Sequence, residues 1–175
     1  MPMYNPDEEI VQIVDQDDQE IAAVTRAMMR TQRLIHRASY ILVFNRAGEL
    51  YVQKRTMTKD IYPGYWDVAA GGVVLAGESY EQSARRELEE ELGIKAPLHP
   101  IFDQYYEDED NRVWGRIFHC IHDGPFILQP EEVEYGRFMT PAIALDYSTI
   151  EPFTPDGILI LKKIIEQHYP ISNLQ

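Results

Sequence analysis

The sequence predicts an α+β protein that begins with a strand-helix extension. Runs rich in Val, Ile, Leu, Tyr and Phe, such as 39–45 and 49–54, lie between turn residues, which is typical of strands in hairpins. Helical patterns with recognisable ends fall at 79–92 and 154–168. The chain has 175 residues, of which 45% are hydrophobic. That size and composition suit a single domain with a sizeable core.

The N-terminal extension is expected to hold a strand at 9–14, an acidic turn at 15–18 and a helix at 20–37. Within that helix, arginines recur at steps of three and four residues. They are Arg26, Arg30, Arg33 and Arg37. We favour a solvated face whose arginines pair with acids elsewhere. A wall that faces phosphate is the alternative.

A β-hairpin is expected next, because the strands at 39–45 and 49–54 are separated by a short turn that contains glycine. The second strand ends in Lys54 and Arg55, and Lys59 follows shortly after. These cations precede a Pro-Gly turn that leads to a pair of glycines. They are candidates for contact with a substrate phosphate, although most lysines and arginines are simply exposed.

The helix at 79–92 has well-defined ends. Ser79 and Gln82 form a capping-box pair, and Gly93 followed by Ile94 is a suitable C-terminal stop. With a rotation of about 100° per residue, the apolar residues of this helix fall on one face and form a stripe. It consists of Tyr80, Ala84, Leu88 and Leu92.

Acidic side chains share or border this apolar stripe. Glu91 projects into it, Glu87 lies beside it, and Glu90 is a little further round. Partly buried carboxylates repel one another, so a hard divalent cation with oxygen ligands is one explanation. A solvated acidic face held by pairs such as Arg86 with Glu90 is the other. The helical projection alone does not choose between them.

Strands are predicted at 97–106 and 113–121, around the acidic loop 107–111. We take this loop as a hydrophilic hairpin tip in preference to a source of another metal ligand. A further short strand is expected at 135–139.

The last predicted helix begins with Thr154 as its N-cap and Pro155 at its first position, and it runs to about His168. One side of it is apolar, so we expect this helix to cover the sheet. That side carries Ile158, Leu161, Ile164, Ile165 and His168.

Charge and composition limit the partners. A net charge of −13 disfavours general binding to nucleic acid or anionic membranes. No apolar run approaches the length of a membrane span, and the N-terminus lacks a signal-peptide pattern, so we expect a cytoplasmic protein. The single cysteine, Cys120, falls in a predicted strand, where we expect it to be buried and unreactive.

The stretch 72–94 resembles the Nudix box, G-x5-E-x7-R-E-U-x-E-E-x-G-U with U aliphatic, at every position. The matching residues are Gly72, Glu78, Arg86, Glu87, Leu88, Glu90, Glu91, Gly93 and Ile94. This resemblance implies a Nudix-type α/β/α sandwich with a central mixed sheet. It also implies that the helix carboxylates hold Mg²⁺ or Mn²⁺ against a diphosphate. Such ions neutralise phosphate oxygens and lower the pKa of a bound water that attacks phosphorus.

By this resemblance, Glu87, Glu90 and Glu91 are the candidate metal ligands and, together with Arg86, the candidate catalytic residues. Glu78 is expected to orient the cluster with Arg86. The catalytic base stays unassigned. Some family members take a further carboxylate ligand from a late loop. The candidates here are Glu131, Glu132 and Glu134.

The chain also resembles the isopentenyl diphosphate isomerase branch of the superfamily over residues 9–165, most strongly at 34–94. By that alignment, Arg55 and Lys59 match residues that hold the substrate diphosphate, so they are the candidate substrate-binding residues. The branch has a catalytic cysteine followed by Gly-His, whereas positions 71–73 here read Gly-Gly-Val. The chain therefore lacks a residue that isomerisation needs as an acid or base on carbon.

Together these features predict a metal-dependent hydrolase that cleaves a diphosphate linkage in a small nucleoside- or prenyl-diphosphate-like substrate. An isomerase-like enzyme and a non-catalytic Nudix domain that senses a nucleotide are the alternatives. We divide the chain into an N-terminal extension, 1–33, and a Nudix hydrolase domain, 34–170, with the box at 72–94. The expected partner is a small diphosphate, with no nucleic acid and no membrane. A homodimer is left open.

Overall fold

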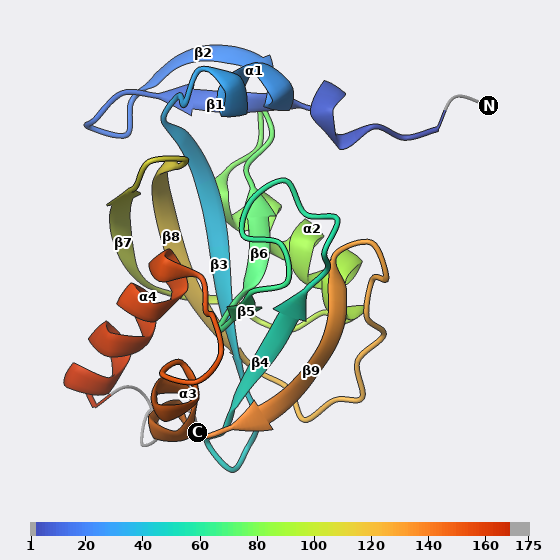
Figure 1. The fold of residues 1–175 in the computed structure, drawn as a ribbon, viewed down its shortest axis with the longest axis vertical. Coiled ribbons are helices and arrows are strands. Elements are labelled where there is room, and N and C mark those ends of the chain that lie inside the picture. The colour runs from blue at the N-terminus through green and yellow to red at the C-terminus, as the bar shows by residue number, and fades with distance from the viewer. Residues whose placement is uncertain (1–2, 169–175) are drawn as a thin grey trace.

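The sheet is built around β3 (His36–Phe44) in the computed structural model, which describes residues 3–168 (Figure 1). β3 pairs in parallel with β8 (Arg112–Ile121) along its whole length. On its other edge it pairs antiparallel with β6 (Ala70–Val73). It meets β4 (Leu50–Arg55) only at the tip of the predicted hairpin. The sheet is therefore mixed, as predicted.

Three further strands extend the sheet. β7 (His99–Glu107) pairs with β8, while β9 (Val133–Met139) and the short β5 (Trp66–Asp67) pair with β4. The predicted hairpin and the three later predicted strands are all present, with their ends within three residues of the prediction. Strong β-formers bounded by turn residues were sufficient to locate them.

Alternate residues of β3 point to opposite faces of the sheet, because side chains alternate along a strand. Leu42 and Phe44 pack in one apolar cluster with residues of α3 (Pro141–Tyr147) and α4 (Pro155–Glu166). Ile41 and Val43 pack in another with the apolar stripe of α2. Figure 1 shows α2 on one side of the sheet and α3 and α4 on the other. The predicted α/β/α sandwich is confirmed.

The ends of α2 (Tyr80–Leu92) follow the predicted caps. The Gln82 N–H donates to Ser79 Oγ at 3.1 Å, and the Ser79 N–H donates to Gln82 Oε1 at 2.9 Å. Gly93 has a φ of 67°, and its N–H donates to the Glu89 carbonyl at 2.9 Å. The predicted apolar stripe is buried along its whole length. The helix prediction at 79–92 is confirmed.

The helix predicted at 20–37 is wrong. Residues Glu20–Thr25 form β2, which pairs antiparallel with β1 (Ile10–Val14). Only Arg26–Thr31 are helical, as α1. The acidic turn at 15–18 closes a β-hairpin instead of leading into a helix. Backbone pairing with β1 outweighs the modest helix preference of this alanine-containing segment.

The four arginines of that segment consequently lie on different elements. Arg26 and Arg30 are on α1 and share Asp60, each at 3.0 Å. Arg33 pairs with an acid at the β7–β8 tip, and Arg37 pairs with acids of the first hairpin. The predicted pairing with acids elsewhere is confirmed, whereas the predicted solvated face is wrong, because Arg26, Arg30 and Arg37 are largely buried.

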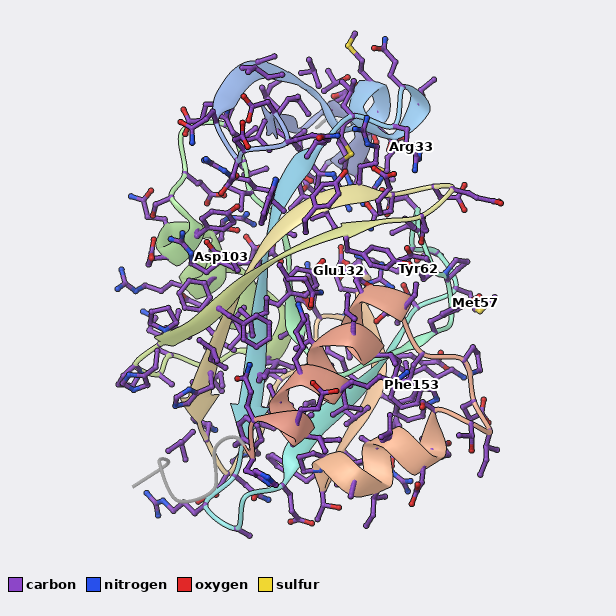
Figure 2. The ribbon with its side chains drawn as sticks, turned by 90° about the vertical axis from the view of Figure 1, so that its left-hand side faces the viewer. Arg33, Met57, Tyr62, Asp103, Glu132 and Phe153 are labelled. Carbon is purple, nitrogen blue, oxygen red and sulfur yellow. The ribbon has the colours of Figure 1, made fainter. Side chains whose placement is uncertain are left out.

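The acidic loop 107–111 is a hairpin tip, as predicted. The Asp108 carboxylate accepts hydrogen bonds from the Asn111 N–H at 2.8 Å and from the Tyr62 hydroxyl. The Arg33 guanidinium donates to the Asp108 carbonyl at 2.9 Å. In Figure 2 this tip passes between Arg33 and Tyr62. The carboxylate of Asp108 is thus engaged in holding the tip together.

Two helices lie at the C-terminal end of the described chain. α4 begins at Pro155 after Thr154, as predicted, although the Thr154 side chain makes no capping hydrogen bond. α3 was not predicted, even though Thr140 precedes it as an N-cap and Pro141 occupies its first position. No helix within residues 3–168 is long and apolar enough to cross a bilayer. Residues 169 and 170 of the predicted domain lie outside the described residues.

The N-terminal unit of β1, β2 and α1 covers one end of β3 (Figure 1). Val11 and Ile13 of β1 pack with Met29 of α1 and with Val73 of β6 in a small apolar cluster. Ile13 also pairs with His36 at the start of β3. This packing places the arginines of α1 beside Asp60, in the segment between β4 and β5.

Cys120 lies in β8 and is fully buried, which confirms the packing role predicted for it. Burial raises the pKa of its thiol to about 12. We expect the native protein to be inert to a disulfide reagent such as dithionitrobenzoate at pH 8, and one thiol to react after unfolding in urea. Rapid labelling of the native protein would contradict this placement.

Candidate active site

Arg86 is the centre of the charged cluster on α2. Its Nε and Nη2 atoms donate to the two carboxylate oxygens of Glu78 at 2.8 and 2.9 Å. Its Nη1 atom donates to Glu87 at 2.8 Å and to Glu90 at 3.2 Å. Because charge-assisted bonds of this bidentate kind fix the plane of a guanidinium, one arginine sets the position of three carboxylates.

Glu87 and Glu91 lie one helical turn apart on the buried side of α2. The Glu91 carboxylate accepts hydrogen bonds from the Gly71 N–H and from Gln53 Nε2, each at 3.2 Å. Burial raises the pKa of Glu87 to about 7 despite the neighbouring Arg86. Burial and the charge of Glu87 raise the pKa of Glu91 to about 8. These two carboxyl groups therefore have too little positive charge around them to ionise readily.

Gly72 allows β6 to pass close to this helix. A Cβ atom at this position would lie 2.7 Å from Glu87 Oε1, which is closer than real Cβ contacts come. A side chain at residue 72 would therefore displace the Glu87 carboxylate. The first glycine of the box thus has a steric role beside the carboxylate cluster.

A cavity lies next to the cluster, and its walls carry both signs of charge. The acidic residues Glu87, Glu90 and Glu132 line it together with the cations Arg86 and Lys59. Lys59 forms an ion pair with Glu132. Figure 2 labels Glu132 near the middle of the molecule. Of the three late-loop glutamates, Glu132 alone lines this cavity.

Of the two predicted substrate-binding residues, Lys59 borders the carboxylate cluster and Arg55 does not. Arg55 lines a second cavity on the other side of Gly71 and Gly72, and Lys59 lines both cavities. The Arg55 guanidinium donates to the Ile61 carbonyl at 2.9 Å. The structure therefore brings together Glu87, Glu90 and Lys59 around one cavity and places Arg55 in its neighbour.

The second cavity contains polar residues that the sequence did not single out. Among them, the Tyr40 hydroxyl donates to Asp156 Oδ2 at 2.6 Å, and Asp67 lies 3.8 Å from Arg55 Nη1. Asp156 could be recognised in the sequence only as an acid in the first turn of a helix. The partners are far apart along the chain, so no local spacing indicates the contact.

The donor set suits Mg²⁺ or Mn²⁺, which prefer carboxylate and carbonyl oxygens. Gln53 Oε1, on the side chain that binds Glu91, is buried and receives no hydrogen bond from the described residues. Within residues 3–168, Arg86 pairs with Glu78, Glu87 and Glu90, and Lys59 pairs with Glu132. The carboxylates outnumber these cations, so negative charge remains for an ion to neutralise. As they stand, no three His, Cys, Asp or Glu side chains within residues 3–168 are arranged to hold a metal ion. Glu87 and Glu90 are turned to Arg86 instead.

Comparison with known proteins gives relatives along most of the chain. The family model for the NUDIX domain matches residues 34–157. An uncharacterized Nudix hydrolase of Pseudomonas aeruginosa is 44% identical over 161 residues, which is 91% of this chain and 95% of that protein. The uncharacterized Nudix hydrolase YfcD of Escherichia coli K12 is 46% identical over 154 residues, which is 87% of this chain and 84% of that protein.

Solved structures share the fold. The crystal structure of DR0079 from Deinococcus radiodurans has a TM-score of 0.79 at 24% identity, and the match covers 89% of this chain and 98% of that one. The Nudix domain of Shewanella oneidensis NrtR complexed with ADP ribose has a TM-score of 0.61 at 15% identity, covering 83% and 99%. At such identities these structures show the fold alone. The family assignment follows from the domain match and the relatives above: the chain belongs to the Nudix hydrolase family.

Proposed function

We propose that this protein cleaves a diphosphate linkage in a small substrate and that it needs Mg²⁺ or Mn²⁺ to do so. As a Nudix hydrolase it acts on phosphorus-containing anhydrides; the metal and the diphosphate linkage are the proposed parts. The observation that carries the proposal is the placement of Glu87 and Glu90 in the lining of a cavity that Lys59 also lines, with Glu91 buried one helical turn from Glu87.

The residues divide into ligands and supports. Glu87, Glu90 and Glu91 would hold the cation, which when bound neutralises phosphate oxygens and lowers the pKa of a water. Arg86, itself held by Glu78, keeps Glu87 and Glu90 in place. Lys59, which lines the same cavity, is positioned to pair with phosphate oxygens. The roles of Arg86, of the three glutamates and of Lys59 are all part of this proposal.

The backbone at Gly71 favours hydrolysis over isomerisation. A Cβ atom there would lie 1.9 Å from the Ser39 carbonyl oxygen, and the residue has a φ of 137°. The cysteine of the isomerases therefore does not fit at this position while β6 pairs with β3. The retention of every box carboxylate also favours an enzyme over a non-catalytic sensor, and ligand binding without turnover would support the sensor.

A screen of diphosphate compounds tests this function. Purified protein with Mg²⁺ or Mn²⁺ is incubated with nucleoside and prenyl diphosphates in isotopically labelled water. We expect release of a phosphorylated product that carries the label, whose position identifies the phosphorus attacked. Conversion of isopentenyl to dimethylallyl diphosphate would favour the isomerase instead. No release from any compound would contradict the proposal.

Replacing Lys59 by glutamine is expected to raise KM about tenfold with a smaller change in kcat, because a charged contact to phosphate is lost in the bound state. Steady-state kinetics measures both values. Lys59 also pairs with Glu132, so the double variant Lys59→Gln with Glu132→Gln is the control. If the double variant recovers the native KM, then Lys59 serves only to neutralise Glu132 and does not bind phosphate.

Other sequence-based expectations accompany the proposal. We place the protein in the cytoplasm. Because its net charge is −13, we also expect it to bind neither nucleic acid nor membranes. The family match at 34–157 supports a Nudix domain that starts at residue 34, after an N-terminal extension. Light scattering after size exclusion decides whether a homodimer forms.

A further inference from the structure

The second cavity adjoins the carboxylate cluster across the backbone of Gly71 and Gly72. Arg26 and Lys59 line both cavities, so a diphosphate beside them can extend from one cavity into the other. The second cavity has further polar and charged side chains in its wall. They include Arg30, His36, Tyr40, Arg55, Asp67 and Asp156.

Two carboxyl groups, Asp67 and Asp156, share this cavity. The Tyr40 hydroxyl donates to Asp156 Oδ2 at 2.6 Å, and the Ala69 N–H donates to Asp67 Oδ1 at 3.2 Å. Burial and the charge of Asp156 raise the pKa of Asp67 to about 7, and burial also raises the pKa of Asp156. Burial and mutual repulsion therefore favour a protonated carboxyl group in this pair near neutral pH. Such a pair can donate one hydrogen bond and accept others.

Three buried polar atoms of residues that line this cavity have no hydrogen-bond partner within the described chain, and one of them is Thr154 Oγ1. Within residues 3–168, neither Arg55 Nε nor His36 Nδ1 takes part in a hydrogen bond. His36 is 2% exposed, and burial, together with the positive charge of Arg30, lowers its pKa to about 3. Its ring is therefore neutral, with one nitrogen that can accept a hydrogen bond. Buried polar atoms are costly when unpaired, so an occupant that supplies hydrogen bonds is favoured over an apolar one.

We propose that the second cavity binds a hydroxyl-rich substituent of the diphosphate substrate, a sugar or polyol, through Asp67, Asp156 and Arg55. Each hydroxyl group both donates and accepts, so it can donate to a carboxylate and accept from the guanidinium. A prenyl chain can do neither. A cationic substituent would meet the arginines and Lys59 that line the same cavity. The inference rests on the proposed function and selects a substrate class within it.

Binding of two matched probes tests this inference without turnover. The probes are α,β-methylene diphosphate esters of ribitol and of pentanol, which have equal carbon chains but differ in their hydroxyl groups. The carbon bridge prevents hydrolysis, and affinities are measured by titration calorimetry with Mg²⁺ present. We expect the ribityl ester to bind at least about tenfold more tightly than the pentyl ester, since a site built for hydroxyls rejects an analogue without them.

Two variants locate the preference. Asp156→Asn keeps the size of the side chain. It should weaken binding of the ribityl ester about tenfold and leave the affinity for the pentyl ester unchanged. Tyr40→Phe removes the hydroxyl that holds Asp156 and should have a smaller effect in the same direction. Glu89→Gln is the control, because Glu89 is exposed and lines neither cavity. Thermal denaturation confirms that each variant is folded.

The outcomes separate this inference from the proposed function. If the native protein binds the two esters with equal affinity, the hydroxyl site is overturned while diphosphate binding stands. The same holds if Asp156→Asn lowers the affinity for both esters equally. If neither ester binds in the presence of Mg²⁺, then the diphosphate proposal and the hydroxyl site are both overturned. A preference for the ribityl ester that Asp156→Asn abolishes supports the inference.

Discussion

Replacing Glu91 by glutamine is expected to lower kcat by about a hundredfold or more while the protein stays folded, because a carboxylate that would hold the cation is lost. Glutamine has nearly the same size as glutamate. Its amide can donate to Gln53 Oε1, which is buried and receives no other hydrogen bond within residues 3–168. The variant therefore separates charge from packing. Steady-state kinetics at saturating Mg²⁺ measures the effect.

Glu89→Gln is the matched control for this experiment. Glu89 lies on the same helix, but it is exposed and pairs only loosely with Lys95, at 3.7 Å. We expect Glu89→Gln to keep the native kcat, since surface ion pairs of this kind contribute little. If kcat falls equally in Glu89→Gln and Glu91→Gln, then kcat depends on the overall charge of α2 and not on Glu91 itself.

Although Glu91→Gln is expected to lose activity, we expect it to be more stable than the native protein near pH 8. The pKa of Glu91 rises from 4.5 in a model compound to about 8 in the folded protein. The folded state therefore keeps a proton that the unfolded state releases, and stability falls as the pH rises through this window. In EDTA, the variant should match the native protein near pH 4.5 and melt at a higher temperature near pH 8. If the native protein instead becomes more stable than the variant as the pH rises from 4.5 to 8, the raised pKa of Glu91 is contradicted.

Replacing Gly71 by alanine is expected to destabilise the protein by about 4 kcal/mol or more, or to prevent folding, because close-packed backbone cannot accept another atom. The added Cβ would lie 1.9 Å from the Ser39 carbonyl oxygen in β3. The residue also has a φ of 137°, which side chains rarely adopt. Urea denaturation followed by circular dichroism measures the loss.

Gly77→Ala distinguishes steric collision from backbone strain. Gly77 also has a positive φ, of 88°, but a Cβ there would meet no atom of the described chain within 4 Å. The expected cost is therefore about 1–2 kcal/mol from strain alone. If Gly71→Ala proves no more destabilising than Gly77→Ala, the close approach of β6 to β3 is wrong.

The elements that could be predicted from sequence are those set by local interactions. The capping pair Ser79 and Gln82 and the left-handed Gly93 fix the ends of α2 within the segment itself. The segment 20–37 shows the opposite case, because its alanines and methionines favour a helix locally. Its first part forms a strand through hydrogen bonds to β1, which composition alone does not reveal.

The candidate site divides in the same way. Glu78, Arg86, Glu87 and Glu90 lie in one loop and helix, so their spacing predicts that they meet, and the structure places them together around Arg86. The second cavity could not be predicted, because its parts come from distant strands and from the last helix. Arg55 was expected at phosphate from the family alignment, and the structure places it in this second cavity, 3.8 Å from Asp67.

Titration calorimetry with Mn²⁺, in the presence of a non-hydrolysable diphosphate, tests most directly whether the carboxylates of α2 hold a cation against linked phosphates. We predict saturable uptake by the native protein and by Glu89→Gln, and uptake weakened about tenfold or more in Glu91→Gln, as expected when a metal ligand is lost. Absence of Mn²⁺ uptake by the native protein, with the diphosphate present, would contradict the account.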